Sequence, residues 1–158
     1  MNTEELICKF HLEPHPEGGY YREIYRSPLM VQVNGEERCA STSIYFLLIE
    51  SAFSAFHRLR WDEIWHFYEG SGLRLYCLSS GGELCIQDMG RSGAEGESIQ
   101  CMIPAGAWFA AEVIRGEFAL VGCTVAPGFE FVDFELALRQ DLIREFPEHQ
   151  SLIERLTR

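Results

Sequence analysis

The stretch EIWHFYEGSGLRLYCLSSGGELCIQDMG, residues 63–90, decides the fold. It holds three short, largely apolar runs, separated by glycine turns at 70–72 and 81–82. Short runs at intervals of roughly 8–12 residues with such turns between them are typical of an all-β sandwich or barrel. Similar runs lie on both sides, from 41–49 to 118–129. We therefore predict a β-rich core over most of the chain.

The two ends of the chain have helical rather than strand-like patterns. Near the start, residues 4–10 predict a short helix capped by Thr3. In the tail, apolar residues recur at helical spacing in 134–146 and again after Pro147. The prediction is a single domain over residues 1–158, with a barrel at about 20–134 and short C-terminal helices at about 135–157 packed on its outside.

Two local patterns near the N-terminus make specific predictions. Asn34-Gly35 is a strong signal for a two-residue hairpin turn. The preceding strand, from Tyr20 onward, alternates its side chains in two sets. These sets are Tyr21, Glu23 and Tyr25 on one side, and Arg22, Ile24 and Arg26 on the other.

Composition excludes several kinds of partner. The formal net charge of −11 disfavours nucleic acid and anionic membrane surfaces. No apolar run approaches the roughly 18–20 residues that cross a bilayer, and residues 1–10 do not resemble a secretory signal peptide. We predict a cytoplasmic protein without membrane or nucleic-acid partners. Its six cysteines form no CxxC pair and are expected to be reduced and mostly buried.

Residues 57–70 resemble the first motif of the cupin fold, in which two histidines and a glutamate precede a glycine. His57, Glu63 and Gly70 match the first histidine, the glutamate and the glycine. Leu59 stands where the second histidine is expected. The second cupin motif keeps its Pro-x-Gly turn at 104–106, but Phe109 replaces its histidine. Two of the four ligands that the resemblance implies are therefore present.

A transition metal needs three or four convergent protein ligands, and His57 and Glu63 supply two. His66 is the third weak candidate. Alternation along a strand places it on the opposite face from Glu63, where a structural hydrogen bond is its simplest role. We predict no cofactor, with a divalent metal as the less favoured alternative.

The resemblance is closer to one small cupin family that is still described as a domain of unknown function. It rests on LEPHPEGGYYREIYRS, STSIYFLL, FHRLRWDEIWHFYEG, PAGAWFAAE and GCTVAPGFEFVDFEL, within residues 12–136. This resemblance implies a double-stranded β-helix barrel with a pocket, usually a homodimer, similar in fold to nucleotide-sugar 3,5-epimerases. This resemblance supports the prediction of the fold much more strongly than any prediction of the activity.

A histidine beside a carboxylate can act as a base near neutral pH. We predict an isomerase- or epimerase-type reaction on a sugar- or nucleotide-like molecule, with His57 as the base and Glu63 orienting it. The sequence does not choose the acid among Tyr21, Tyr45 and Tyr76. The alternative for the His57–Glu63 pair is a structural hydrogen bond within the barrel.

Several aromatic residues are predicted to line the pocket. They are Tyr45, Trp61, Trp65, Phe67 and Phe109. The alternative is that they only fill the barrel. Residues 13–23, with charged side chains around Gly18-Gly19, are interpreted as a lid, an arm crossing a dimer or a surface loop. A non-catalytic ligand-binding or structural homodimer and, less favoured, a metal-dependent enzyme remain as alternative functions.

Overall fold

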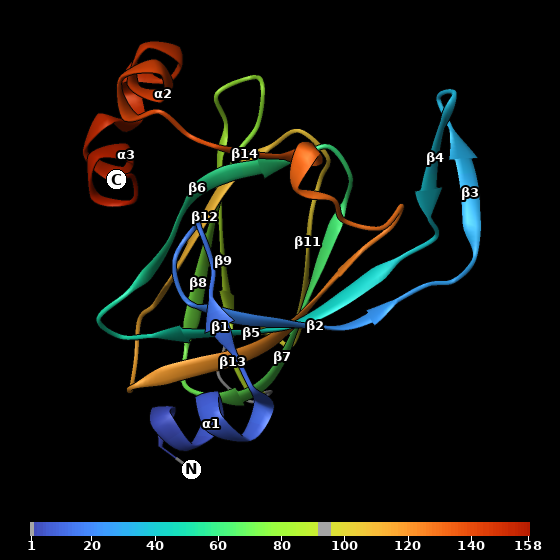
Figure 1. The fold of residues 1–158 in the computed structure, drawn as a ribbon. Helices are drawn as coiled ribbons and strands as arrows, with labels where there is room; N and C mark the ends of the chain where they lie inside the picture. Colours follow the sequence, from blue (N-terminus) through green and yellow to red (C-terminus); the bar gives the residue numbers. More distant parts are fainter. Residues whose placement is uncertain (1, 92–95) are drawn as a thin grey trace.

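The computed structural model describes residues 2–91 and 96–158, and two six-stranded sheets dominate it (Figure 1). The first sheet consists, in spatial order, of β1 (Glu13–Pro14), β2 (Tyr20–Arg26), β5 (Thr42–Ile49), β13 (Phe118–Val125), β7 (Glu63–Gly70) and β11 (Gln100–Ile103). The second consists of β10 (Glu97–Ser98), β9 (Leu84–Met89), β8 (Leu73–Leu78), β12 (Trp108–Val113), β6 (Phe53–Leu59) and β14 (Phe134–Leu136). Neighbouring strands are antiparallel except β9 and β10. The predicted all-β cupin barrel is confirmed.

The two sheets enclose an apolar core between them. Side chains that alternate inward along the strands fill it, among them Phe46, Trp65, Leu75 and Phe109. Figure 1 shows the sheets facing each other around this interior. The core fills only part of the barrel, and a cavity occupies the remainder.

Helix α1 (Thr3–Phe10) covers the outer face of the first sheet. Leu6 is fully buried against Leu47 and Leu120, which point outward from β5 and β13. The N-cap is Asn2 rather than the predicted Thr3. The Asn2 side chain accepts the Glu5 N–H, and the Glu5 side chain accepts the Asn2 N–H, which forms a capping box.

The C-terminal helices α2 (Arg139–Glu145) and α3 (Gln150–Arg155), joined by the 3-10 turn η2 (Pro147–His149), cover the second sheet. Leu142 and Ile153 are buried beneath them, as the periodicity predicts. The predicted start of this helical tail at about 135 is wrong. Residues 134–136 instead form β14, which pairs with β6, because the edge of β6 offers hydrogen-bond partners to an extended backbone.

The predicted hairpin at Asn34-Gly35 is confirmed. It joins β3 (Met30–Val33) to β4 (Glu36–Cys39), and Asn34 and Gly35 have φ of 54° and 81°. Both angles are those of a type I′ turn. The hairpin projects away from the barrel (Figure 1). Across residues 2–91 and 96–158, the helices are too short and too polar to cross a bilayer.

Candidate functional site

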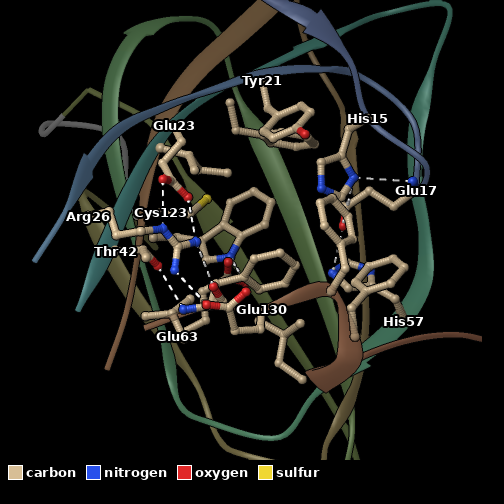
Figure 2. Close-up of a pocket in the computed structure, with 18 of the residues that line it drawn as sticks. His15, Glu17, Tyr21, Glu23, Arg26, Thr42, His57, Glu63, Cys123 and Glu130 are labelled. Carbon is tan, nitrogen blue, oxygen red and sulfur yellow. Dashed lines mark hydrogen bonds and ion pairs between the residues drawn. The ribbon is translucent and has the colours of Figure 1, made fainter. Parts of the chain in front are cut away.

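A cavity of about 300 Å³ opens between the two sheets. Its walls come from β2, β5, β6, β7 and β13, from the segment before β2 and from residues 129–134. Its polar lining consists of Glu13, His15, Glu17, Tyr21, Glu23, Arg26, Thr42, His57, Glu63, Cys123 and Glu130. Figure 2 shows many of these side chains converging on the same space.

His57 and Glu63 reach this cavity from opposite sheets, on β6 and β7. The predicted direct pairing of these two residues does not occur, because another carboxylate binds His57. The Oε2 atom of Glu17 lies 3.0 Å from Nε2 of His57. In Figure 2, Glu17 lies beside His57, and Glu63 lies apart from them.

Hydrogen bonds fix the Glu17–His57 pair in place. The Ser54 hydroxyl donates to Oε1 of Glu17 at 2.8 Å, and Nδ1 of His57 donates to the Ala55 carbonyl at 2.7 Å. Burial alone would raise the pKa of Glu17, but the charge and hydrogen bond of His57 outweigh it and hold that pKa below its usual value. Burial alone would lower the pKa of His57, but Glu17 raises it above its usual value.

Both ring nitrogens of His57 thus face acceptors, a carboxylate and a carbonyl. Each acceptor requires an N–H, so the ring is a doubly protonated imidazolium. An imidazolium has no lone pair with which to accept a proton. The geometry therefore does not suit His57 as the proton-accepting base while Glu17 holds it.

Glu63 lies in a different electrostatic environment. It is 7% exposed, and its Oε2 accepts a hydrogen bond from the Trp65 indole at 2.8 Å. No ion pair to Glu63 occurs within residues 2–91 and 96–158. Burial, together with the charge of Glu17, raises the pKa of Glu63 to about 7. A carboxyl group with this pKa exchanges a proton readily near neutral pH.

The segment before β2 brings Glu17 into the cavity. The Ala55 N–H donates to the Glu17 carbonyl, which binds the segment to β6. Gly18 has a φ of 114°, and a Cβ there would collide with the Phe53 carbonyl oxygen. A residue without a side chain is needed for this close approach. Of the roles considered for residues 13–23, covering the pocket agrees best with this placement.

A β-bulge in β2 changes which side chains face the cavity. Tyr21, Glu23 and Arg26 all line it, although strict alternation predicts Arg26 on the opposite side. The register of β2 against β5 shifts between Glu23 and Tyr25, so the alternation reverses there. Arg26 consequently donates to Glu23 at 2.9 Å and to Glu130 at 2.7 Å.

The predicted aromatic lining is found only in part. Trp65 lines the cavity. Phe109 lies behind His57 in the core, with ring centroids 4.0 Å apart. Phe67 packs against the same core, outside the cavity wall. Trp61 lies in the turn after β6, where its indole donates to Asp133 at 3.2 Å.

Of the three tyrosines considered as acids, Tyr21 lines the cavity. Tyr45 alternates with the inward-facing Ile44 and Phe46, so it points outward beneath α1. Tyr76 lies under the C-terminal helices and donates to Glu112 at 2.7 Å.

Sequence reasoning did not identify the remaining aromatic wall. It consists of Phe46, Phe129, Phe131 and Phe134. The last three follow β13, in the GCTVAPGFEFVDFEL segment, where phenylalanine recurs within a few residues. This recurrence of phenylalanine is the sequence pattern that indicates the aromatic wall. For Glu17, the corresponding pattern is the cluster of charged residues around Gly18-Gly19.

The side chains at this site do not fit a bound catalytic metal. His57 uses both nitrogens within the protein, and apolar Leu59 and Phe109 occupy the other ligand positions. His66 lies on the other face of β7, near the Thr124 hydroxyl at 3.2 Å. Within the described part of the chain, no three His, Cys, Asp or Glu side chains converge as metal ligands would.

Comparison with known proteins agrees with this architecture. An X-ray structure of a protein from Shewanella oneidensis superimposes with a TM-score of 0.94 at 40% identity, covering 100% of this chain and 98% of that chain. A hypothetical protein from Leishmania major gives 0.94 at 32% identity, with 99% of each chain covered. Bacillus subtilis oxalate decarboxylase gives 0.59 at 17% identity, over 95% of this chain and 37% of that chain, which is a likeness of fold alone.

Sequence comparison gives the same assignment. The uncharacterized protein YML079W of Saccharomyces cerevisiae is 28% identical over 159 residues, covering 90% of this chain and 79% of that protein. The model of the cupin superfamily family DUF985 matches residues 4–137. With this match over most of its length, the chain belongs to the DUF985 family of the cupin superfamily.

Proposed function

We propose that this chain is a cytoplasmic protein that binds a small molecule in the barrel cavity and transfers a proton on it, as an isomerase or epimerase does. The observation that carries the proposal is the burial of the Glu63 carboxyl group at the cavity wall, away from any counter-ion among the described residues. This buried carboxyl faces the cavity with a pKa near 7 and without a counter-ion among the described residues. General acid–base catalysis is most efficient when the pKa of the group lies near the working pH.

The contacts in the cavity suggest a division of roles that differs from the sequence-based prediction. Glu63, in its carboxylate form, takes a proton from the carbon next to a substrate carbonyl. The electron pair of the broken C–H bond moves onto the carbonyl oxygen and gives an enolate. His57 donates no hydrogen bond to that oxygen, because Glu17 and the Ala55 carbonyl accept from both of its N–H groups. Glu17 keeps His57 protonated.

Reprotonation at the same carbon completes the reaction. Tyr21 is the tyrosine of the cavity wall, and burial together with Glu13 raises its pKa above the usual value. The phenol therefore stays protonated at neutral pH and can donate. Donation by Tyr21 to the face opposite Glu63 would give the epimer, and return of the proton from Glu63 would give exchange alone.

Hydrogen exchange tests this proposal directly. The protein is incubated in D₂O with small sugar-like carbonyl compounds, and loss of the α-proton signal is followed by NMR. Glu63→Gln should slow exchange by about 10²–10⁴-fold, the range that one general acid–base group contributes. Glu50→Gln, an exposed position in the turn after β5, is the matched control and should exchange as the wild type does.

A non-catalytic binding protein is the alternative function. Saturable binding without exchange, unchanged in Glu63→Gln, would support this alternative and refute proton transfer.

We also propose that the protein is a homodimer. Exposed apolar side chains gather on β2 and at the start of the hairpin. They are Ile24, Tyr25, Leu29 and Met30. A buried interface would remove this surface from water. Light scattering should give twice the chain mass of 18.1 kDa, and a mass of one chain at micromolar concentration would refute the dimer.

A further inference from the structure

The cavity wall carries far more acidic than basic groups. Its glutamates are Glu13, Glu17, Glu23, Glu63 and Glu130. Against these five carboxyl groups stand one arginine and two histidines. A negative lining in a partly enclosed, low-dielectric space repels anions and attracts cations.

The positive groups are already engaged within the protein. Arg26 contacts Glu23 and Glu130, and its guanidinium also donates to the Phe129 carbonyl at 2.9 Å. His57 is bound by Glu17. His15 accepts the Glu17 N–H at its Nδ1 atom, and burial lowers its pKa, which disfavours the charged form. Among the described residues, the cavity therefore keeps no unengaged cationic side chain for a ligand's phosphate or carboxylate.

Glu63 is a buried acidic group of this wall, and no ion pair to it occurs among the described residues. It is more than nine-tenths buried, faces the cavity, and has the Trp65 indole as its one hydrogen-bond donor among the described residues. A buried carboxyl in this position provides one half of an ion pair. A ligand with a positive charge would provide the other half.

Aromatic rings form the rest of the wall. They are Tyr21, Phe46, Trp65, Phe129, Phe131 and Phe134. Rings arranged around an acidic centre favour organic cations, because the ring faces attract positive charge and the ring surfaces also bury alkyl groups. The volume of about 300 Å³ lies at the small end of ligand pockets. Both features favour a compact ligand.

We propose that the cavity binds a small organic ammonium compound without phosphate, whose positive charge lies between Glu63 and the aromatic wall. This inference rests on the proposed function only in taking the cavity as the ligand site. It narrows the sugar- or nucleotide-like ligand predicted from the sequence, because nucleotides carry phosphate.

Calorimetry with three related probes tests the charge preference in the wild-type protein. Choline is compared with 3,3-dimethylbutan-1-ol, its neutral isostere, and with phosphocholine, which adds an anionic group. Choline should bind at least about tenfold more tightly than the isostere, as expected for a cation held by desolvated rings and a carboxylate. Phosphocholine should bind more weakly than choline.

Variants test whether Glu63 is the residue that recognises the positive charge of choline. Glu63→Gln should weaken choline binding about tenfold and leave binding of the neutral isostere unchanged. The control Glu50→Gln should bind as the wild type does. The comparison among the three probes uses the wild type alone, so the test stands even if Glu63→Gln fails to fold.

The inference is overturned if the isostere binds as tightly as choline or if phosphocholine binds more tightly than choline. It is also overturned if choline fails to saturate the protein at concentrations of roughly tens of millimolar. Failure of the proposed function looks different. Proton exchange on a neutral sugar without choline binding would refute the ammonium ligand and keep the acid–base function. Choline binding without proton exchange on any carbonyl compound would refute the acid–base function and keep the ammonium ligand.

Discussion

Replacing Glu63 by glutamine should make the protein more stable relative to the wild type as the pH rises. Burial raises the pKa of Glu63 from 4.5 to about 7. Between these values the folded protein binds more protons than the unfolded chain, so the wild type loses stability as the pH rises through this window. Glutamine cannot ionise, and its side-chain oxygen can still accept the Trp65 indole hydrogen bond.

The magnitude follows from the size of the pKa shift. A shift of about 2.5 pH units corresponds to about 3 kcal/mol, at 1.36 kcal/mol per unit. We therefore compare the unfolding free energy of Glu63→Gln with that of the wild type. The variant's value minus the wild-type value should rise by about 3 kcal/mol from about pH 4 to about pH 8. The pairing of Glu17 with His57 also titrates, but it is present in both proteins and largely cancels in the difference.

Urea denaturation at a series of pH values measures this difference. The surface variant Glu50→Gln is the control, and its difference from the wild type should stay within about 0.5 kcal/mol. A difference for Glu63→Gln that is constant with pH would show that Glu63 is not held in a low-dielectric site. A difference that falls with rising pH would show that the carboxylate is stabilised in the fold, and the assignment of Glu63 as a base would fail.

Three further substitutions test how the site is built. Ser54→Ala should lower the unfolding free energy by about 1–3 kcal/mol, because Glu17 loses a buried hydrogen-bond donor. Chemical denaturation measures this loss, and an unchanged unfolding free energy would show that the Ser54 hydroxyl does not stabilise Glu17. Gly18→Ala should destabilise the protein and displace Glu17, because the new Cβ meets the Phe53 carbonyl; an unchanged melting temperature would contradict this. Leu6→Ala should cost about 2–5 kcal/mol by leaving a void beneath α1, and a loss well below 1 kcal/mol would show that α1 is loosely attached.

Local patterns in the sequence predicted much of the fold. The Asn34-Gly35 turn depends on two residues that tolerate positive φ, so the hairpin could be placed without knowledge of its surroundings. The C-terminal helices could be predicted because their apolar residues repeat at helical spacing. The start of the tail could not, because residues 134–136 become a strand only by pairing with β6, which is distant in sequence.

The sequence predicts two residues of the candidate site, but it does not predict the ion pair between His57 and Glu17. Motif positions predict His57 and Glu63, and both line the cavity. No sequence pattern links Glu17 to His57, because the two residues are forty positions apart and the segment of Glu17 carries no strand pattern. Strict alternation places Arg26 on the wrong side of its strand, since the bulge in β2 depends on the register with β5.

The sequence by itself determined an acidic, β-rich chain with a cupin motif that has lost two of its ligand positions. It did so because strand alternation, glycine turns and motif spacing are properties of neighbouring residues. Only the tertiary structure decided the chemistry of the cavity. The ionisation of Glu63 and His57 depends on which charges burial brings close in space, and that proximity arises when β6, β7 and the Glu17 segment come together.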